Sequence, residues 1–461
     1  MSDSPTRSHP ESHGHSGVSS SDHGASGFAP PTALERAWAD RAAGQRERAL
    51  RLALTAIEGR TAGPWAALLV VRLLLEARRD QVASRAIDPL VTAFIDRGDL
   101  PGGVVAAGLL AAERRQAALR RLAQAFARGS ERVTDAPVAP PPLPDGKPAQ
   151  AEQQALAGEP LLARAEQLLQ LYLSLEAGSG APSRLPRLAL FGSLSADALV
   201  RLLGILGSRE IQPGANVVRE GEPGREAFVL ARGRLQVVRQ SAGEHAGLAN
   251  LGPGDLFGEM ALVSDAPRAA SVIAATASEV LVASRERLEE LAGQEPALGE
   301  TLARFCQRRM LQNLVRHSPI LSSLQPKQRE QLMGRFKTRH FEAGRALITQ
   351  GSQAPGLYLI ASGEVSVCSP DQDGDTVVLA VLGPGDVAGE ISLVLRREAN
   401  ASVVATHPTV ALELTHEQFQ HSIREHPNLL ARLYEIATQR DEETRSVVAQ
   451  RALDVEDVVL V

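Results

Sequence analysis

Apolar residues return at helical spacing along the first third of the chain. Between residues 31 and 132, side chains such as Leu34, Trp38, Leu50 and Leu54 recur every three to four positions, which is the period of an amphipathic α-helix. Glycine, proline and charged residues interrupt this pattern at 59–64, near 79–80 and at 99–103. The pattern predicts an all-α region of four or five helices, packed as antiparallel pairs.

The first helical pair has a distinctive sequence. The run from Ala33 to Ile57 is similar to a tetratricopeptide-like hairpin with Gly44 at its turn, although no second copy follows at a period near 34 residues. The same region holds more arginines than acids. We expect either a docking surface for an unidentified protein partner or ordinary solvated helix faces.

Three segments lack the large apolar residues of a folded core. Residues 1–30 are rich in Ser, His and Gly, which predicts a disordered tail. Residues 133–160 are rich in Pro and Ala, as in a semi-extended linker. Residues 448–461 alternate acidic and apolar side chains and are expected to form a tail.

The last 300 residues contain an internal repeat. Gly221 and Gly233 match Gly351 and Gly363 at an offset of 130, and the string GPGD at 252–255 returns at 383–386 at an offset of 131. Two homologous domains therefore follow each other, at 161–317 with a leading helix and at 318–447.

Within each repeat, short strands alternate apolar and polar residues between glycines. In the second copy, Leu357 and Leu359 share one face of a strand, while Tyr358 and Ile360 share the other. Many short strands with glycine-rich turns are typical of a β-sandwich or jelly roll. Helices at both ends make each copy an α+β unit, so the fold class is multidomain α+β.

One spaced string in the first copy carries a family resemblance. Residues 257–272, FGEMALVSDAPRAASV, resemble the phosphate-binding cassette of the cyclic nucleotide-binding domain, found in regulatory subunits of cyclic-AMP-dependent protein kinase and in the catabolite activator protein. The resemblance covers about 187–317 and 317–447. The ligand contacts that it implies are Gly258, Glu259, Met260, Ala261, Arg268, Ala269, Ala270 and Ser271.

These residue types suit a cyclic 3′,5′-phosphate. Arg268 can present a planar fork to the two exocyclic oxygens. A short helix opening at about Glu259 would direct N–H groups toward the phosphate, and its carboxylate can accept a hydrogen bond from the ribose 2′-hydroxyl. The small Ala269 and Ala270 let the backbone approach closely. The alternative is a surface salt bridge between Arg268 and Glu259, which would contribute little.

The base preference follows from the resemblance. A Thr directly after the arginine tends to favour cyclic GMP in this family, whereas Ala is typical of cyclic-AMP sites. Here the residue is Ala269. The resemblance thus implies cyclic AMP as the ligand, with cyclic GMP as the second possibility.

The second copy departs from the pattern. Its cassette is 387–403, VAGEISLVLRREANASV, where Ala399 replaces Arg268 and Glu398 replaces Pro267. A phosphate would lack its cation there, so we expect a structural or dimerising role. A degenerate site would instead use Gly389, Glu390, Ser392 and Arg397.

Composition and charge narrow the function. The chain has 44% hydrophobic residues, a net charge of -5 and only two cysteines, which excludes a four-cysteine metal site and favours a cytoplasmic protein. No apolar run is long enough to span a membrane. We expect no DNA binding, because a catabolite-activator type would need a helix-turn-helix after the second repeat.

No phosphate loop with lysine, HExxH or GxSxG motif occurs. We therefore expect a non-enzymatic cyclic-nucleotide receptor without metal or cofactor, in which residues 285–316 transmit binding to the second domain and the helical region. A homodimer fits this class of protein. The alternative is a ligand-independent scaffold whose β-sandwiches and helical region bind proteins.

Overall fold

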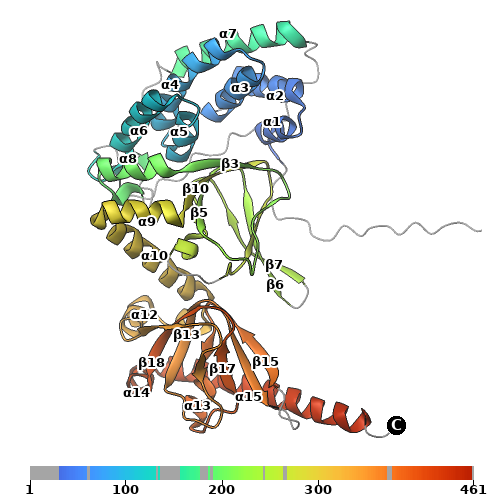
Figure 1. Cartoon of the computed structure of the whole chain (residues 1–461), viewed down its shortest axis with the longest axis vertical. Coiled ribbons are helices and arrows are strands. Elements are labelled where there is room, and N and C mark those ends of the chain that lie inside the picture. Colours follow the sequence, from blue (N-terminus) through green and yellow to red (C-terminus); the bar gives the residue numbers. More distant parts are fainter. Residues whose placement is uncertain are drawn as a thin grey trace, which may run out of the picture. The chain divides into compact units, whose positions relative to one another are not determined.

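The computed structural model describes residues 31–59, 63–130, 133–134, 156–176, 185–186, 191–241, 244–262, 267–370 and 376–458. The elements form a helical region followed by two β-sandwich domains (Figure 1). The predicted tail at 1–30 and most of the predicted linker at 133–160 lie outside the described residues. Within the described part, no helix combines the length and apolarity needed to cross a membrane.

The helical region contains seven helices among its described residues. Their bounds are α1 Ala33–Ala42, α2 Arg46–Glu58, α3 Pro64–Glu76, α4 Asp80–Asp96, α5 Leu100–Ala107, α6 Ala112–Phe126 and α7 Gly158–Glu176. Thr32 caps α1 in a capping box with Glu35. Gly44 stands in the turn before α2 with a φ of +79°. The predicted hairpin is present, and its tetratricopeptide character stays a prediction.

The break expected at 99–103 lies at 97–99, because helix α5 begins at Leu100 and contains both glycines. Asp99 accepts a hydrogen bond from the Gly102 amide at 2.8 Å and so caps the helix. A methyl group at Gly102 would lie 2.4 Å from Phe94, and one at Gly103 would lie 2.5 Å from Leu122. The glycine pair therefore lets α5 pack closely between α4 and α6. The described residues before 127 form six helices, not the four or five that the sequence predicted.

Helix α7 packs with the helical region. It starts at Gly158 and contacts α2, α3 and α4, whereas the sequence suggested that residues from 161 onward lead into the first sandwich. Leu161, Leu168 and Leu169 are buried against that helical core. Arg97 and Glu176 form an ion pair at 2.7 Å across the same contact.

The first sandwich consists of short strands between helices. The bounds are η2 Phe191–Ser193, α8 Ala196–Ile205, β3 Gly207–Ile211, β4 Asn216–Val218, β5 Glu226–Arg232, β6 Leu235–Ser241, β7 Glu244–Leu251, β8 Leu256–Phe257, η3 Glu259–Leu262, β9 Ser271–Ala274, β10 Ser278–Ser284, α9 Arg285–Gln294 and α10 Pro296–His317. A two-residue pairing of β1 Val133–Thr134 with β2 Leu185–Pro186 precedes it.

The second sandwich repeats this order. The bounds are α11 Pro319–Ser322, α12 Pro326–Met333, β11 Lys337–Phe341, β12 Ala346–Ile348, β13 Gly356–Ser362, β14 Val365–Pro370, β15 Thr376–Leu382, β16 Val387–Ala388, α13 Glu390–Leu395, β17 Ser402–Ala405, β18 Thr409–Thr415, α14 His416–Glu425 and α15 Pro427–Val458. The predicted tail at 448–461 is corrected in its described part: residues 448–458 are helical and continue α15.

Both sandwiches have the same antiparallel topology. In the first, the sheets run β3-β10-β5-β8 and β4-β9-β6-β7; in the second, they run β11-β18-β13-β16 and β12-β17-β14-β15. Each strand of one copy thus has a counterpart at the same place in the other. The predicted pair of jelly-roll domains is confirmed.

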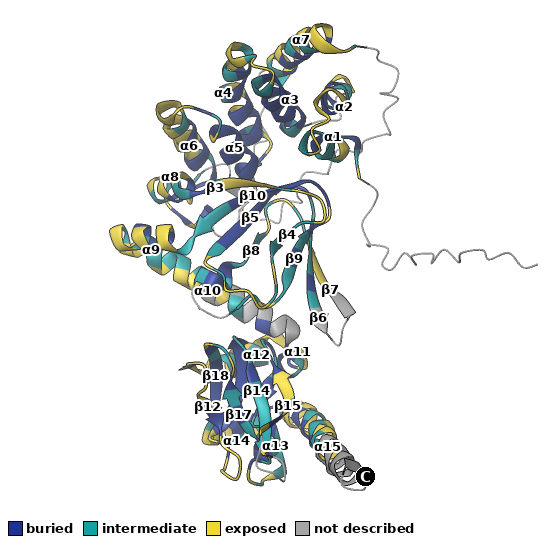
Figure 2. Ribbon diagram, turned by 45° about the vertical axis from the view of Figure 1, so that its right-hand side comes forward, coloured by how far each residue is buried: buried dark blue, intermediate teal, exposed yellow. Residues whose placement is uncertain are grey.

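Strand β5 is buried on both faces. Phe228 and Leu230 point into the core of the first sandwich, while Val229 and Ala231 join the helical core. Helix α5, which is buried along its whole length, packs against β5 from the helical side (Figure 2). The helical region therefore covers the outer face of the first sheet.

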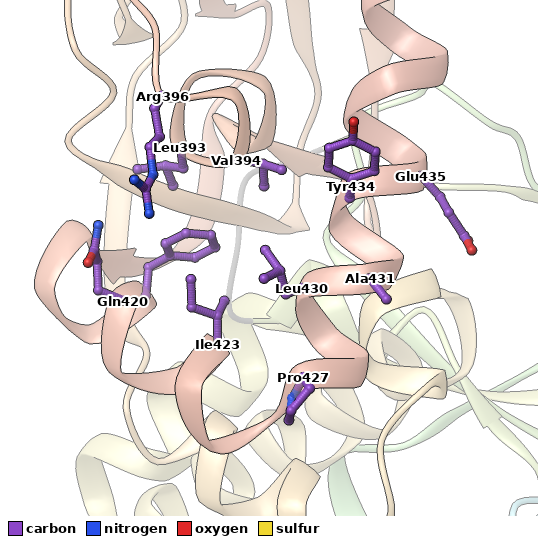
Figure 3. A pocket seen from close by; sticks show the side chains of 11 residues that line it. Leu393, Val394, Arg396, Gln420, Ile423, Pro427, Leu430, Ala431, Tyr434 and Glu435 are labelled. Atoms are coloured by element: carbon purple, nitrogen blue, oxygen red, sulfur yellow. The ribbon is translucent and has the colours of Figure 1, made fainter.

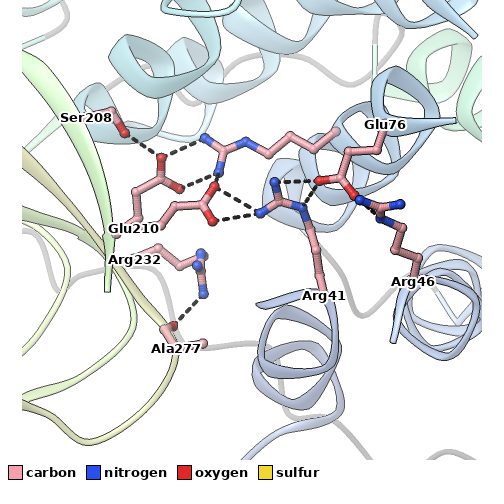
Figure 4. Close-up of polar contacts among 9 residues, drawn as sticks. Arg41, Arg46, Glu76, Ser208, Glu210, Arg232 and Ala277 are labelled. Carbon is pink, nitrogen blue, oxygen red and sulfur yellow. Dashed lines mark hydrogen bonds and ion pairs between the residues drawn. The ribbon is translucent and has the colours of Figure 1, made fainter. Parts of the chain in front are cut away.

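A buried ion network joins the helical region to that sheet (Figure 4). Arg72 of α3 donates to both carboxylate oxygens of Glu279 on β10, at 2.6 and 3.0 Å. It also bonds Glu210 on β3, which accepts from Arg41 of α1 at 2.8 and 2.9 Å. Glu279 is fully buried. A buried carboxylate needs such a partner, because an unpaired charge in this place would be costly.

Trp38 and Arg232 stack beside this network. The Arg232 guanidinium of β5 lies 3.8 Å from the ring centre of Trp38 on α1, which is cation–π geometry. It donates to the Ala277 carbonyl at 2.6 Å. Burial lowers the pKa of Arg232 to about 9, an effect that the nearby Glu279 carboxylate opposes.

Candidate nucleotide site

The phosphate-binding arginine predicted in the first copy has a defined position. Arg268 Nη1 donates to the Gly258 carbonyl at 3.0 Å, and Nη2 donates to the Glu226 carbonyl at 2.8 Å. A methyl group at Gly224 would lie 2.2 Å from Arg268 Nε. The guanidinium therefore lies directly against Gly224, a residue that the sequence analysis did not single out.

The Arg268 side chain is half-buried, so its guanidinium is partly shielded from water. Burial is the main reason why the pKa of Arg268 lies below its usual value, and the carboxylates of Glu226 and Glu259 oppose that shift. Its guanidinium also lies 5.7 Å from the ring centre of Phe228. Two of the five N–H groups of a guanidinium are used by the backbone carbonyls, so a bidentate contact with an anion remains possible.

The start of the cassette forms a single turn behind Arg268. Gly258 has a φ of +71°, and η3 follows from Glu259 to Leu262. Glu259 and Ala261 are buried, and Met260 is half-buried. Because Glu259 is 4% exposed, a surface salt bridge does not describe its environment. Residues 263–266 of the cassette lie outside the described residues.

Helix α10 packs behind this turn. Cys306 Sγ lies 4.0 Å from the Glu259 carbonyl oxygen. Burial raises the pKa of the Cys306 thiol to about 11, and the Glu259 charge adds to the effect. The protonated thiol is a weak donor to this carbonyl and so joins α10 to the cassette.

The end of the cassette is more open. Ala269 is exposed, and Ala270 and Ser271 are half-buried. The Ala269 carbonyl accepts a hydrogen bond from Arg239 Nε of β6 at 3.1 Å. Ser271 Oγ accepts from the Glu220 amide at 2.9 Å, so this hydroxyl joins β9 to the loop after β4.

The second cassette has the same backbone frame. In the first copy, Arg268 exchanges backbone hydrogen bonds with Gly221 and Glu222, each at 2.9 Å. In the second, Ala399 exchanges them with Gly351 and Ser352, again at 2.9 Å. Ala399 therefore occupies the backbone position of Arg268, and the hydrogen-bond register of the loop is the same in both copies.

A cation from α15 reaches the second cassette instead. Arg440 Nη1 donates to Glu390 Oε1 at 2.9 Å and to the Val387 carbonyl at 2.6 Å. Glu390 is buried, as is Glu259 at the matching position. The repeat aligns Arg440 with Arg309 of α10, whose side chain lies outside the described residues.

The remaining residues of the proposed degenerate site hold α13 in place. Ser392 Oγ accepts from the Ala354 amide at 3.3 Å and donates to the Arg397 carbonyl at 2.6 Å. Arg397 forms an ion pair with Asp441 of α15. Gly389 precedes α13 with a φ of +88°. The structure thus brings Gly389, Glu390 and Ser392 together and directs Arg397 toward α15.

A groove lies beside α13 rather than inside the second cassette (Figure 3). It has a volume of about 590 Å³ and lies between α13, α14 and α15. Its apolar lining includes Leu393, Val394, Phe419, Ile423, Leu430 and Tyr434. None of the four residues predicted for a degenerate site lines this groove.

Sequence reasoning missed three residues near the cassettes. The sequence analysis assigned no role to Gly224, Arg239 or Arg440. The repeat itself held a signal, because Gly224 and Arg239 of the first copy become Ala354 and Ser369 in the second. Arg440 lies 50 residues from Glu390 in the chain, and no local pattern connects the two.

Comparison with known families and proteins gives a consistent result. The model of the cyclic nucleotide-binding domain matches residues 208–295 and 338–426. A cAMP-dependent protein kinase type II regulatory subunit of Drosophila melanogaster is 32% identical over 223 residues, 48% of this chain and 56% of that protein. A cAMP-dependent protein kinase regulatory subunit of Hypocrea atroviridis is 32% identical over 252 residues, 53% and 52% of the two chains.

The chain spans about half the length of these curated relatives. Among solved structures, the regulatory domain of Toxoplasma gondii PKA with cAMP is 23% identical and covers 54% of this chain and 92% of its own, with a TM-score of 0.27. Residues 208–295 and 338–426 are therefore two cyclic nucleotide-binding domains.

Proposed function

We propose that the chain is a non-enzymatic cytoplasmic receptor that binds one cyclic nucleotide, in its first sandwich domain. The observation that carries this proposal is the difference between the two cassettes. Arg268 is placed with its guanidinium against Gly224 and Phe228, while Ala399 occupies the same backbone position in the second copy. A cyclic phosphate needs a cation of this kind to replace its hydration.

Cyclic AMP is the preferred nucleotide in this proposal. The side chain directly after Arg268 is the exposed methyl of Ala269, which cannot hydrogen-bond a guanine as a threonine hydroxyl can. The curated relatives that match the chain are named as regulatory subunits of cAMP-dependent protein kinase. Their names support a regulatory role for this chain as well.

The signal would travel by two routes. Helix α10 contacts the cassette through Cys306 and the Glu259 carbonyl and leads into the second domain. Strand β5 carries Glu226, which holds Arg268, and Arg232, which stacks on Trp38 of the helical region. Nucleotide binding would shift the populations of these contacts. Unchanged hydrogen exchange of residues 286–316 on adding cAMP would rule out the α10 route.

The helical region is then part of the receptor. Several of its arginines pair within the chain, as Arg72 does with Glu279, Arg114 with Asp88 and Arg97 with Glu176. This pairing weakens the case for a basic docking surface. A protein partner of the helical region would instead respond to how this region packs on β5 and β10.

The test is calorimetric titration of cAMP and cGMP into the full chain, the Arg268→Ala variant and an Arg225→Ala control. Arg225 is an exposed arginine next to Gly224 that pairs with Glu286. We expect one equivalent of cAMP to bind to the wild type and to the control. Loss of the Arg268 cation should weaken binding by roughly 100-fold or more, as for a half-buried ion pair that loses a partner.

Two results would contradict the proposal. Absence of binding by the wild type would favour a scaffold in which both sandwiches serve protein assembly. Binding that survives in Arg268→Ala would place the ligand elsewhere.

A further inference from the structure

We propose that the space beside the cassette glycine is a second determinant of phosphate recognition, set by Gly224 and Val218 in the first domain and closed by Ala354 and Ile348 in the second. The proposal rests on the proposed function above, because it concerns the same kind of site. It adds that the second domain excludes a phosphate by its packing as well as by its missing arginine.

The first domain shows what fills this space when the arginine is present. A methyl group built on Gly258 would meet Arg268 Nη1 at 2.8 Å, and one built on Gly224 would meet Arg268 Nε at 2.2 Å and Cζ at 2.3 Å. The guanidinium thus lies against both glycines. Neither position can carry a side chain unless the guanidinium moves.

The second domain fills the same space with hydrocarbon. A methyl group built on Gly389, the counterpart of Gly258, would meet Ile348 Cδ1 at 3.1 Å and Ala354 Cβ at 3.6 Å. Ala354 is the counterpart of Gly224, and Ile348 that of Val218. These two atoms are the carbons that glycine and valine lack. Two methyl groups therefore stand where the first domain holds its cation.

Both side chains are part of the folded core. Ile348 is 4% exposed and Ala354 is 3% exposed, and the Ala354 amide donates to Ser392 Oγ at 3.3 Å. Protein cores are close-packed, so they do not yield an extra side chain without rearrangement. An arginine introduced at position 399 alone would have to displace these methyl groups or turn outward into water.

The carboxylate of the second site is retained. Arg440 uses Glu390 Oε1, and a carboxylate has several acceptor positions on its two oxygens. Restoring both the cation and its space should therefore restore phosphate binding, whereas restoring the cation alone should not.

The experiment uses the full chain in an Arg268→Ala background, so that heat of cAMP binding comes from the second domain alone. The variants are Ala399→Arg, the triple Ile348→Val with Ala354→Gly and Ala399→Arg, and the pair Ile348→Val with Ala354→Gly as the control without a cation. We expect the triple variant to bind cAMP at least tenfold more tightly than Ala399→Arg, and the control not to bind.

A reciprocal variant tests the first domain without touching a charged group. Gly224→Ala, in otherwise wild-type protein, should weaken cAMP binding at least tenfold while the melting temperature stays close to that of the wild type. Gly224 has no left-handed φ, so alanine fits the backbone, and only the flexible guanidinium must move.

The outcomes separate this inference from the proposed function. If the wild type binds no cAMP, the proposed function fails, and the triple variant alone then decides the inference. The inference is overturned if Ala399→Arg binds as tightly as the triple variant, if the triple variant does not bind, or if Gly224→Ala binds like the wild type.

Discussion

The two sandwich domains share one backbone topology but differ in the side chains that complete their cassettes. Their strands follow the same order, and Arg268 and Ala399 make the same backbone hydrogen bonds at the same lengths. In the first domain, the cassette is completed by a cation beside two glycines. In the second, methyl groups fill that place, and Arg440 of α15 pairs with the buried Glu390.

The sheets differ as much as the cassettes do. Glu210 and Glu279 face each other across β3 and β10, while His340 and Val410 occupy the matching pair on β11 and β18. Like charges directly opposite on a sheet are destabilising. In the first sheet, Arg72 and Arg41 of the helical region pair with these carboxylates, whereas the matching pair of the second sheet has no carboxylate to neutralise. The comparison shows that the first domain depends on other parts of the chain, and that the second is closed by its own last helix.

The largest expected effect comes from removing Arg72, which links the helical region to the first sheet. Arg72→Met leaves the buried Glu279 without its ion pair, while Glu210 keeps Arg41, and should destabilise the helical region and first domain by about 3–5 kcal/mol. Urea unfolding followed by tryptophan fluorescence measures it, because both tryptophans, Trp38 and Trp65, lie in the helical region near the contact.

A matched second substitution makes the same test specific. Glu279→Val installs the residue that the second domain has at this place, and in the Arg72→Met background it should recover more than half of the lost stability. If Glu279→Val adds to the loss instead, the Glu279 carboxylate is not the reason why the first domain needs Arg72.

The second expected effect concerns the closure of the second domain. Arg440→Met leaves the buried Glu390 without its ion pair and should lower the opening free energy of α13 by about 2–3 kcal/mol. Hydrogen exchange of the amides in β16 and α13 measures this change. Arg445→Met is the control, because Arg445 is an exposed partner of Asp441 and should shift it by less than about 0.5 kcal/mol. Equal effects of the two variants would show that Arg440 does not hold the cassette.

Much of this comparison could be read from the sequence. Offsets of 130 and 131 aligned the two copies, and the replacement of Arg268 by Ala399 was visible in that alignment. The two sandwiches lie within the part of the chain where the internal repeat was found. Period and glycine spacing are local signals, and they predict local structure well.

The contacts that complete each copy were not local. Arg72 and Glu279 are 207 residues apart, and nothing near either residue marks it as a partner. The break expected at 99–103 lies slightly earlier, at 97–99, because Gly102 and Gly103 belong to α5, where Phe94 and Leu122 on other helices leave no room for a side chain. Glycine read alone indicates a turn, while glycine at a close helix contact indicates packing.

The third expected effect concerns the ribose 2′-hydroxyl of the bound nucleotide. Glu259 is buried behind Arg268, and we expect its carboxylate to accept a hydrogen bond from the ribose 2′-hydroxyl. A hydrogen bond to a charged group contributes about 1.5–3 kcal/mol, so 2′-deoxy-cAMP should bind roughly ten- to 140-fold more weakly than cAMP. Competition titrations on the wild type and on Glu259→Gln measure the ratio, which should shrink in the variant. Equal binding of both nucleotides by the wild type would show that Glu259 does not bind the ribose 2′-hydroxyl.

The smallest expected effect asks whether a shared feature is structural or ligand-binding. Ser271 Oγ accepts from the Glu220 amide at 2.9 Å, and its counterpart Ser402 Oγ accepts from the Gln350 amide at 3.0 Å. Because the bond is the same in a domain with the phosphate cation and in one without it, we infer that the hydroxyl serves the backbone frame. Ser271→Ala and Ser402→Ala should each cost about 1 kcal/mol of stability.

Affinity for cAMP then separates the two roles of Ser271. If the hydroxyl only stabilises the backbone, Ser271→Ala should bind cAMP within about threefold of the wild type. A threefold change in affinity corresponds to well under the 1.4 kcal/mol of a tenfold change. A tenfold loss of affinity in Ser271→Ala, with equal stability losses in both variants, would show that the hydroxyl also contacts the nucleotide. The repeat would then have kept a ligand-binding serine in a domain that no longer has the arginine to use it.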